Sequence, residues 1–412
     1  MNNLEEVKQI LKDNNQEHLL FGYESMTEVN REKLLYQISK INFKLIKELY
    51  EKAKNTVSFE KEKIEPINYI NKDKLPKEEL EKYINKGEEI IKNGELAFVT
   101  MAGGQGTRLG HAGPKGTFIL GEITNKSLFE IACDELKNAK EKYGVLIPWY
   151  IMTSEENNDD TIKFFEKNNY FNYPKNAIWF FKQGEIPMID TNGKIMLEED
   201  YTIKQGADGH GGIFEAMLKN DIISDMQKRN IKWVYTGGID NVLAKPIDPI
   251  CIGIGVYENA GAVGKSLVKA NPEERVGVFC KRNGKPSVIE YTEISDEMAR
   301  QQNENGELAY GEAHILCNMF NMKVIENISK NKLPYHPAFK KATYINDKGE
   351  KIIGDSPNGY KFETFIFDAF SMLGDMAILR VKREEEFAPV KNAEGTDSPK
   401  TARELYKNYW KM

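Results

Sequence analysis

Two patterns of hydrophobic and polar residues divide this chain of 412 residues. From residue 1 to residue 92, apolar residues recur every three or four positions among lysine and glutamate, most clearly at Leu34, Leu35, Ile38, Ile41, Leu45, Ile46 and Leu49. That spacing predicts amphipathic helices. Beyond residue 95, short apolar runs alternate with longer segments of mixed polarity, without internal repeats or low-complexity tracts. We therefore expect a helical N-terminal segment followed by an α/β domain.

The second part predicts strands separated by helices. The strands are predicted at residues 96–100, 145–152, 177–181 and 232–236, and the helices at 127–142 and 213–228. Such alternation predicts a mostly parallel sheet covered on both faces. Asn283-Gly284 predicts a hairpin between two further strands, at 276–281 and 287–294. A small mixed part begins near residue 332, so the expected division is 1–92, 93–331 and 332–412.

The most informative stretch follows the first of these strands. It reads Met101-Ala-Gly-Gly-Gln-Gly-Thr-Arg-Leu-Gly110, and Pro114-Lys115-Gly116 comes soon after it. Glycines after a strand let the backbone approach a ligand, and successive amides there can hold phosphate oxygens. Arg108 and Lys115 add two cations on the same loop. The spacing fits neither a Walker A loop nor the dinucleotide-binding fingerprint. A plain tight turn is the alternative interpretation, and the two cations favour phosphate binding over it.

A carboxylate forms the second candidate. Asp240 ends the strand that begins at residue 232 and stands beside Asn241. Parallel sheets bind ligands at the carboxyl ends of their strands, where the glycine-rich loop and Asp240 both fall. A carboxylate there can hold Mg²⁺ that bridges phosphate oxygens. A capping or turn aspartate is the alternative interpretation.

Composition excludes several classes of function. The chain has 63 acidic and 57 basic residues, a net charge of −6, and no basic block, which argues against nucleic-acid and anionic-membrane partners. No apolar stretch approaches the ~20 residues of a membrane span, and the N-terminus lacks a signal-peptide pattern. Four widely spaced cysteines predict neither a zinc site nor a disulfide framework: Cys133, Cys251, Cys280 and Cys317. Motifs of serine hydrolases and zinc proteases are missing. We expect a reduced, cytoplasmic enzyme.

The glycine-rich stretch resembles the signature of UDP-sugar pyrophosphorylases, which make a UDP-sugar and pyrophosphate from UTP and a sugar 1-phosphate. Further blocks resemble the UDP-N-acetylhexosamine branch in the family's order, across residues 95–405: Tyr235-Thr-Gly-Gly-Ile-Asp-Asn241, Gly277-Val-Phe-Cys-Lys281, Val288-Ile-Glu-Tyr-Thr-Glu-Ile-Ser295, Leu333-Pro-Tyr-His-Pro-Ala-Phe-Lys-Lys341, Asn358-Gly-Tyr-Lys-Phe-Glu-Thr-Phe-Ile-Phe-Asp368 and Phe387-Ala-Pro-Val-Lys-Asn392. The resemblance implies an α/β fold with a mostly parallel, Rossmann-like nucleotidyltransferase sheet, a helical N-terminal segment and a small mixed C-terminal part.

The resemblance also implies substrates and a cofactor. It favours UTP and N-acetylglucosamine 1-phosphate as substrates, UDP-N-acetylglucosamine as product, and Mg²⁺ as cofactor. The alternatives are a UTP–glucose-1-phosphate uridylyltransferase or a UDP-sugar pyrophosphorylase of broad specificity, and then a non-catalytic protein that binds UDP-sugars. The resemblance leaves open the oligomeric state, the order of binding, regulation and the effect of ending at Met412.

The same resemblance implies roles for particular residues. The catalytic cations are Arg108, Lys115 and Lys391; the metal ligand is Asp240; the nucleotide-binding residues are Ala102, Gly103, Gly104, Gln183, Gly209, His210 and Asp240; and the sugar-binding residues are Gly277, Glu290, Asn318, Phe365 and Phe367. His210 stands where the acetylhexosamine branch usually has asparagine and the UDP-glucose branch has histidine, so the sugar stays open. Lys391 is implied to reach the α-phosphate from a C-terminal part that closes over the ligands. From the residues alone, Glu290 also fits a solvent-facing strand position, and the two phenylalanines fit core positions.

Overall fold

The computed structural model describes residues 4–54 and 62–412, which group into two compact units. The smaller unit is built from Met1–Glu60, Gly184–Gly212 and Leu333–Phe365, and the larger unit from Lys61–Gln183, Ile213–Lys332 and Ile366–Met412. This grouping differs from the three consecutive parts expected from the sequence, because two later segments pack with the N-terminal helices. Each unit is described separately below.

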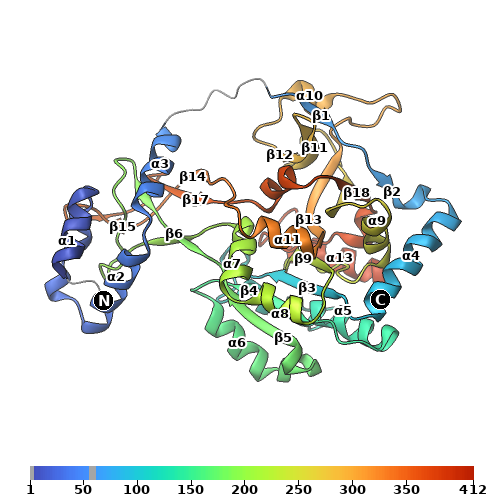
Figure 1. The fold of residues 1–412 in the computed structure, drawn as a ribbon, viewed down its shortest axis with the longest axis horizontal. Coiled ribbons are helices and arrows are strands. Elements are labelled where there is room, and N and C mark those ends of the chain that lie inside the picture. Colours follow the sequence, from blue (N-terminus) through green and yellow to red (C-terminus); the bar gives the residue numbers. More distant parts are fainter. Residues whose placement is uncertain (1–3, 55–61) are drawn as a thin grey trace. The chain divides into compact units, whose positions relative to one another are not determined.

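The larger unit is organised by a sheet whose strand order is β2-β18-β10-β13-β9-β3-β4-β5 (Figure 1). These strands are β2 (Ile70–Asn71), β3 (Leu96–Met101), β4 (Trp149–Thr153), β5 (Ile178–Lys182), β9 (Trp233–Gly238), β10 (Ala262–Val268), β13 (Glu312–Asn321) and β18 (Met376–Arg380). Along this path only β13 runs antiparallel to its neighbours. The expected α/β fold with a mostly parallel sheet is therefore confirmed.

Helices cover both faces of this sheet. Successive side chains of a strand point to opposite faces. Trp149 of β4 packs against Phe129 of α5 (Leu128–Tyr143), whereas the hydroxyl of Tyr150 donates to Asp225 of α8 (Ile222–Lys228) from the other face. Within the sheet the Phe98 and Trp149 rings stack, with centroids 5.7 Å apart. Each such buried side chain contributes about 1.5–3 kcal/mol to folding.

Two further helices of the larger unit cross at glycines. These are α4 (Lys77–Lys92) and α9 (Pro249–Tyr257). A Cβ built on Gly87 would lie 1.9 Å from the carbonyl oxygen of Pro249, and one on Gly253 would lie 2.1 Å from that of Tyr83. The helix backbones thus approach more closely than any other residue would allow. The remaining helices of this unit are α6 (Asn158–Lys167), α7 (Ile213–Lys219), α10 (Asp296–Arg300), α11 (Met322–Ile328), α12 (Arg383–Glu386) and α13 (Pro399–Trp410).

The Asn283-Gly284 hairpin is also present in the larger unit. It joins β11 (Val278–Arg282) to β12 (Lys285–Ile289), with φ values of 50° and 80° at the two turn residues. Positive φ at both central positions is typical of the type I′ turn that matches strand twist. β11 also pairs with the short strand β1 (Ile64–Pro66), which the helical pattern of the N-terminal segment did not predict.

One predicted helix is wrong in extent. The segment 213–228 forms two helices, α7 and α8, because Asp221 adopts a left-handed conformation with φ of 59° between them. The side chain of Asn220 caps the first helix by donating to the carbonyl of Ala216. Asparagine and aspartate tolerate such local conformations better than other non-glycine residues. Likewise, the strand predicted at 145–152 begins only at Trp149, after Pro148, which cannot donate to a strand ladder.

The smaller unit packs helices on short strands. Its helices are α1 (Leu4–Asp13), α2 (Glu28–Lys40) and α3 (Phe43–Lys54); its strands are β6 (Glu185–Pro187), β7 (Ile189–Asp190), β8 (Gln205–Ala207), β14 (His336–Lys340), β15 (Tyr344–Ile345), β16 (Lys351–Ile352) and β17 (Gly359–Glu363). Leu34, Ile38, Ile46 and Leu49 are buried in one core with Phe362. The predicted helical face is therefore confirmed. In the described part of the chain, no helix is both long and apolar enough to span a membrane.

Candidate active site

The glycine-rich loop follows β3 and is held by its own backbone. The amide of Lys115 donates to the carbonyl of Gly104 at 3.0 Å, and that of Gly106 donates to Gly113 at 2.9 Å. A Cβ on Gly103 would lie 2.8 Å from Oε1 of Gln183, so glycine there lets the Gln183 amide lie against the loop. A Cβ on Gly104 would meet nothing within 4 Å, and Arg108 is exposed. The predicted loop residues and Gln183 are thus brought together.

Asn157 anchors this loop and was not predicted from the sequence. It is fully buried, and its Nδ2 donates to the carbonyl of Ala102 at 2.9 Å and to that of Gly104 at 3.3 Å. Its Oδ1 accepts from the amide of Ser154, just beyond β4. Because a buried amide needs its partners, Asn157 holds the loop in one conformation. The only feature of the sequence that could have indicated Asn157 is its place in the polar run that follows the strand predicted at 145–152.

The register of the sheet brings Asp240 to the glycine-rich loop. β3 and β9 run parallel with Met101 opposite Gly238, so the loop and the turn that carries Asp240 leave the same sheet edge. The ammonium of Lys115 lies 3.9 Å from Oδ2 of Asp240, and both side chains are about one fifth exposed. A cation and a carboxylate thus meet at the carboxyl ends of two neighbouring strands, where α/β sheets bind ligands.

The backbone just before Lys391 is hydrogen-bonded to the turn that carries Asp240. The amide of Val390 donates to the carbonyl of Asp240 at 2.9 Å, and the amide of Val242 donates to the carbonyl of Ala388 at 3.2 Å. Lys391 therefore follows directly on a residue bonded to Asp240. Its half-exposed ammonium lies 3.4 Å from Oδ2 of Asp397.

The resemblance implied that Lys391 comes from a C-terminal part that closes over the ligands. Residues 366–412 belong to the larger unit, and the backbone beside Lys391 is already bonded to the Asp240 turn. The closing of this part over bound ligands stays a prediction.

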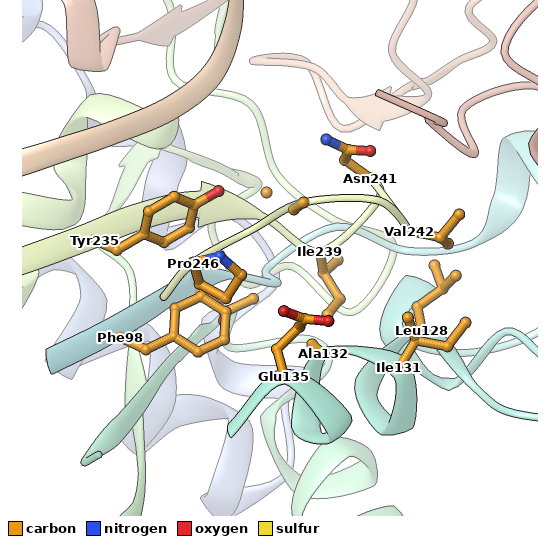
Figure 2. Close-up of a pocket in the computed structure, with 13 residues that line it drawn as sticks. Phe98, Leu128, Ile131, Ala132, Glu135, Tyr235, Ile239, Asn241, Val242 and Pro246 are labelled. Atoms are coloured by element: carbon orange, nitrogen blue, oxygen red, sulfur yellow. The ribbon is translucent and has the colours of Figure 1, made fainter. Parts of the chain in front are cut away.

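A small cavity lies behind the Asp240 turn. It holds about 20 Å³, room for a single water, and lies among Phe98, Tyr235, Ile239, Asn241 and other residues of β3, α5 and the 238–246 turn. Figure 2 shows the Glu135 side chain directed from α5 into this space. Burial raises the pKa of Glu135 to about 7, against the opposing effect of Lys245. The cavity is too small for a nucleotide, so it is not where the substrate would bind.

Four predicted sugar-binding residues lie in the larger unit: Gly277, Glu290, Asn318 and Phe367. A Cβ on Gly277 would lie 2.9 Å from Oε1 of Glu290, so that carboxylate lies against glycine backbone. Asn318 is fully buried on β13; its Oδ1 lies 3.2 Å from Nε2 of His314, and its Nδ2 has no hydrogen-bond partner among the described residues. The Phe367 ring packs edge-on against His314 at 6.2 Å. His314, which the sequence did not single out, therefore joins two of the predicted residues.

The last three of the predicted site residues, two for the nucleotide and one for the sugar, lie in the smaller unit. These are Gly209, His210 and Phe365, and the His210 and Phe365 rings have centroids 5.4 Å apart. Gly209 has φ of 87°, and a Cβ on it would lie 2.3 Å from the carbonyl oxygen of Thr364. Glycine is thus required twice over, by conformation and by space. Phe365 and Phe367, treated as a pair in the sequence, belong to different units.

The donor set at Asp240 fits a hard cation held jointly with substrate. Among residues 4–54 and 62–412, no three His, Cys, Asp or Glu side chains gather where they could hold a metal ion. Mg²⁺ commonly binds through one or two carboxylates together with substrate phosphates, rather than in a cage made by protein alone. Asp240 supplies such a carboxylate, partly exposed and beside the phosphate loop.

Known proteins resemble this chain over nearly its whole length. UDP-N-acetylglucosamine pyrophosphorylase of Saccharomyces cerevisiae is 35% identical over 425 residues, which covers 97% of this chain and 89% of the relative. UDP-N-acetylglucosamine diphosphorylase 2 of Arabidopsis thaliana is 35% identical over 418 residues, covering 96% and 82%. The crystal structure of the uridine diphosphate N-acetylglucosamine pyrophosphorylase from Trypanosoma brucei, in complex with an inhibitor, superimposes with a TM-score of 0.83 at 31% identity, covering 98% and 84%.

The family model gives the same result. Residues 40–397 match the UDPGP family, described as UTP–glucose-1-phosphate uridylyltransferase. This match takes in the glycine-rich loop, the Asp240 turn and Lys391. It confirms the resemblance to UDP-sugar pyrophosphorylases seen in the sequence blocks. The chain belongs to the UDPGP family of nucleotidyltransferases.

Proposed function

We propose that this chain transfers UMP from UTP to N-acetylglucosamine 1-phosphate and releases pyrophosphate. A phosphate oxygen of the sugar phosphate attacks the α-phosphorus of UTP, and the bond from that phosphorus to the bridging oxygen of the β-phosphate breaks. The sugar phosphate is already an anion at neutral pH, so no general base is needed. The barrier lies in bringing two anions together and in the charge that develops around the α-phosphate.

The observation that carries this proposal is the meeting of Lys115, Asp240 and the Lys391 backbone at one sheet edge. Lys115 and Arg108 would bind the triphosphate together with the loop amides. Lys391 would supply a cation on the side of the α-phosphate. Asp240 would hold Mg²⁺, which when bound neutralises charge on the phosphate oxygens. Positioning and fixed charge are the main catalytic means available to such an enzyme.

The preference for an N-acetylated sugar is part of the proposal. The names of the yeast, plant and trypanosome relatives support it. The rival, glucose 1-phosphate, rests on His210 and on the description of the family model. In the larger unit, Glu290 and the unpartnered Nδ2 of Asn318 offer hydrogen-bonding groups for a sugar. We expect Glu290→Ala to raise KM for the sugar phosphate by about 5–150-fold, the equivalent of ~1–3 kcal/mol, with KM for UTP nearly unchanged.

The direct test is pyrophosphate release across the four nucleoside triphosphates and several hexose 1-phosphates. UTP with N-acetylglucosamine 1-phosphate should give the highest kcat/KM, in a reaction that requires Mg²⁺ or Mn²⁺ and runs backwards from UDP-sugar and pyrophosphate. No release from UTP with any hexose 1-phosphate would refute the enzyme assignment. A higher kcat/KM with glucose 1-phosphate would refute the sugar preference alone.

A cytoplasmic location also remains part of this proposal. The cysteines at 133, 251, 280 and 317 are buried and free of disulfides. Burial raises the pKa of each thiol, which makes these groups poorly reactive. Free buried thiols support a reducing compartment.

A further inference from the structure

A set of buried charges lies behind the segment that carries Lys391. The ammonium of Lys265, on β10, lies 2.6 Å from Oε2 of Glu386 and 2.7 Å from Oδ2 of Asp248. The ammonium of Lys72 lies 3.0 Å from Oε1 of Glu386. The side chains of Lys265, Asp248 and Glu386 are 2%, 6% and 1% exposed, and that of Lys72 is 22% exposed. Both oxygens of the Glu386 carboxylate are therefore held by cations.

Three of these groups, Lys265, Lys72 and Asp248, stay ionised at any pH at which such an enzyme works. Burial by itself lowers the pKa of Lys265, but Asp248 and Glu386 raise it well above its usual value. The pKa of Asp248 is held at about 2 by Lys265 and Lys72, against the opposing effect of burial. The network is thus a permanent structural feature.

Buried ion pairs are seldom explained by stability alone. Apolar residues of similar volume often stabilise a fold as well or better, whereas removing one partner leaves an unpaired buried charge. What a charged network adds is a defined geometry, because each carboxylate oxygen has its own partner. The question is therefore which part of the molecule this network holds in place.

The network holds the start of a segment made of Glu386 and the five residues that follow it. The carbonyl of Glu386 accepts a hydrogen bond from Nδ2 of Asn241 at 2.7 Å, and Oδ1 of Asn241 accepts from the amide of Ala388 at 2.8 Å. The amide of Val390 then donates to the carbonyl of Asp240. Lys391 is the next residue. Its own side chain is 42% exposed, so its position depends largely on this backbone.

We infer that Glu386, held by Lys265 and Lys72, is a positioning residue that fixes the register of segment 386–391 against the Asp240 turn and so places Lys391 at the reacting phosphate. This inference rests on the proposed nucleotidyl transfer for its kinetic consequence. Its structural part, the anchoring of the segment, stands on the contacts of Glu386 alone.

The kinetic test is a double-mutant cycle between Glu386 and Lys391. Glu386→Gln keeps the shape of the side chain and removes its charge. We expect kcat to fall by about tenfold or more while KM for UTP changes by less than about threefold. In a Lys391→Ala background, Glu386→Gln should cost little further kcat, because the residue through which it acts is gone. Glu386→Asp should recover part of the loss.

Glu312→Gln is the matched control. Glu312 is another buried carboxylate, and its hydrogen bonds go to the buried Arg380 and to Ser266 rather than to the Asp240 turn. It should lower the melting temperature while leaving kcat within about threefold of the parent. Should Glu386→Gln fail to fold, Lys72→Met takes its place. This variant removes one of the two cations on Glu386 from a less buried position. It should show a smaller fall in kcat, again with little change in KM for UTP.

Amide hydrogen exchange tests the anchoring without any turnover. In Glu386→Gln, the amides of Ala388 and Val390 should exchange faster than in the parent. In Glu312→Gln, the same two amides should exchange at the parental rate. Unchanged exchange at both amides would overturn the inference. So would a folded Glu386→Gln enzyme with parental kcat, or losses that multiply in the double variant. A parent without turnover would instead refute the proposed function, and exchange would then decide the anchoring.

Discussion

Asp240 and Lys391 are separated by 150 residues in the sequence, but the residue just before Lys391, Val390, is hydrogen-bonded to the Asp240 carbonyl in the fold. At the scale of single residues, the site is a small set of fixed charges on backbone that cannot easily move. Asn241 contributes most to this, because its side chain bonds to both Glu386 and Ala388. Fixed charges of this kind lower a barrier because they need no rearrangement when charge develops.

Asp240→Ala should leave the fold intact and lower kcat by about 10²-fold or more, the usual effect of losing one preorganised charged group. Only a partly exposed carboxylate is removed, so little packing is lost. The check is initial rates across a Mg²⁺ titration, with the exposed Asp160→Ala on α6 as control. Near-normal rates at all Mg²⁺ concentrations would mean that Asp240 does not hold the ion.

Lys391→Ala should cut kcat by about 10²–10³-fold while the affinity for UTP changes much less. Lys391→Arg should restore little, since a planar guanidinium does not replace a compact ammonium. Steady-state rates together with UTP binding by calorimetry separate the two effects, and the exposed Lys400→Ala serves as control. If kcat of Lys391→Ala stays within about threefold of the parent, Lys391 has no catalytic role.

At the scale of elements, local chemistry explains most boundaries. β3 is buried along its whole length and leads into glycines, whereas the segment 213–228 breaks where Asn220 and Asp221 prefer turn conformations. The α4–α9 crossing instead depends on space between elements. Gly87 and Gly253 each face the carbonyl of the opposite helix.

Gly253→Ala should therefore destabilise the larger unit by about 1–3 kcal/mol or more, because a methyl group there collides with backbone that cannot turn aside. The control is Gly374→Ala, where an added Cβ would meet nothing within 4 Å. That variant should stay within about 0.5 kcal/mol of the parent. Urea unfolding of both variants measures the difference, and equal stabilities would show that the helices can separate freely.

At the scale of the whole molecule, the two units differ in their tryptophan content. All four tryptophans, Trp149, Trp179, Trp233 and Trp410, belong to the larger unit. Tryptophan fluorescence therefore follows the unfolding of the unit that carries the phosphate loop, without a direct signal from the other. This allows the effect of one buried group on that unit to be measured.

Glu135 should make the larger unit less stable as pH rises through neutrality. Its pKa is raised from 4.5 to about 7 in the folded state, so its proton favours folding below about pH 4.5 and that contribution is lost as pH rises towards and past 7. The groups around it are Lys245, Asp134, Lys265 and Glu386. Glu135→Gln should flatten this slope, with a gain over the parent at pH 8 on the order of 2 kcal/mol. Parallel pH profiles of the two proteins in urea unfolding would contradict the assignment.

Features that depend on neighbouring residues could be predicted from the sequence. The buried run before the glycine-rich loop, the Asn283-Gly284 turn and the helical face around Leu34 follow from side-chain periodicity and turn preference, which act over a few residues. The family blocks likewise singled out Asp240 and Lys391 as chemical candidates.

Which distant segments meet could not be predicted in this way, because it depends on contacts made in the folded chain. The division into two units of non-consecutive segments, the loop anchor Asn157 and the pairing of Glu386 with Lys265 leave no local pattern in the sequence. The neighbouring residues in the sequence do not distinguish a buried asparagine or glutamate from an exposed one. What distinguishes the two is the partner that the folded chain brings to it, and the cost of leaving it without one is what fixes that pairing in the fold.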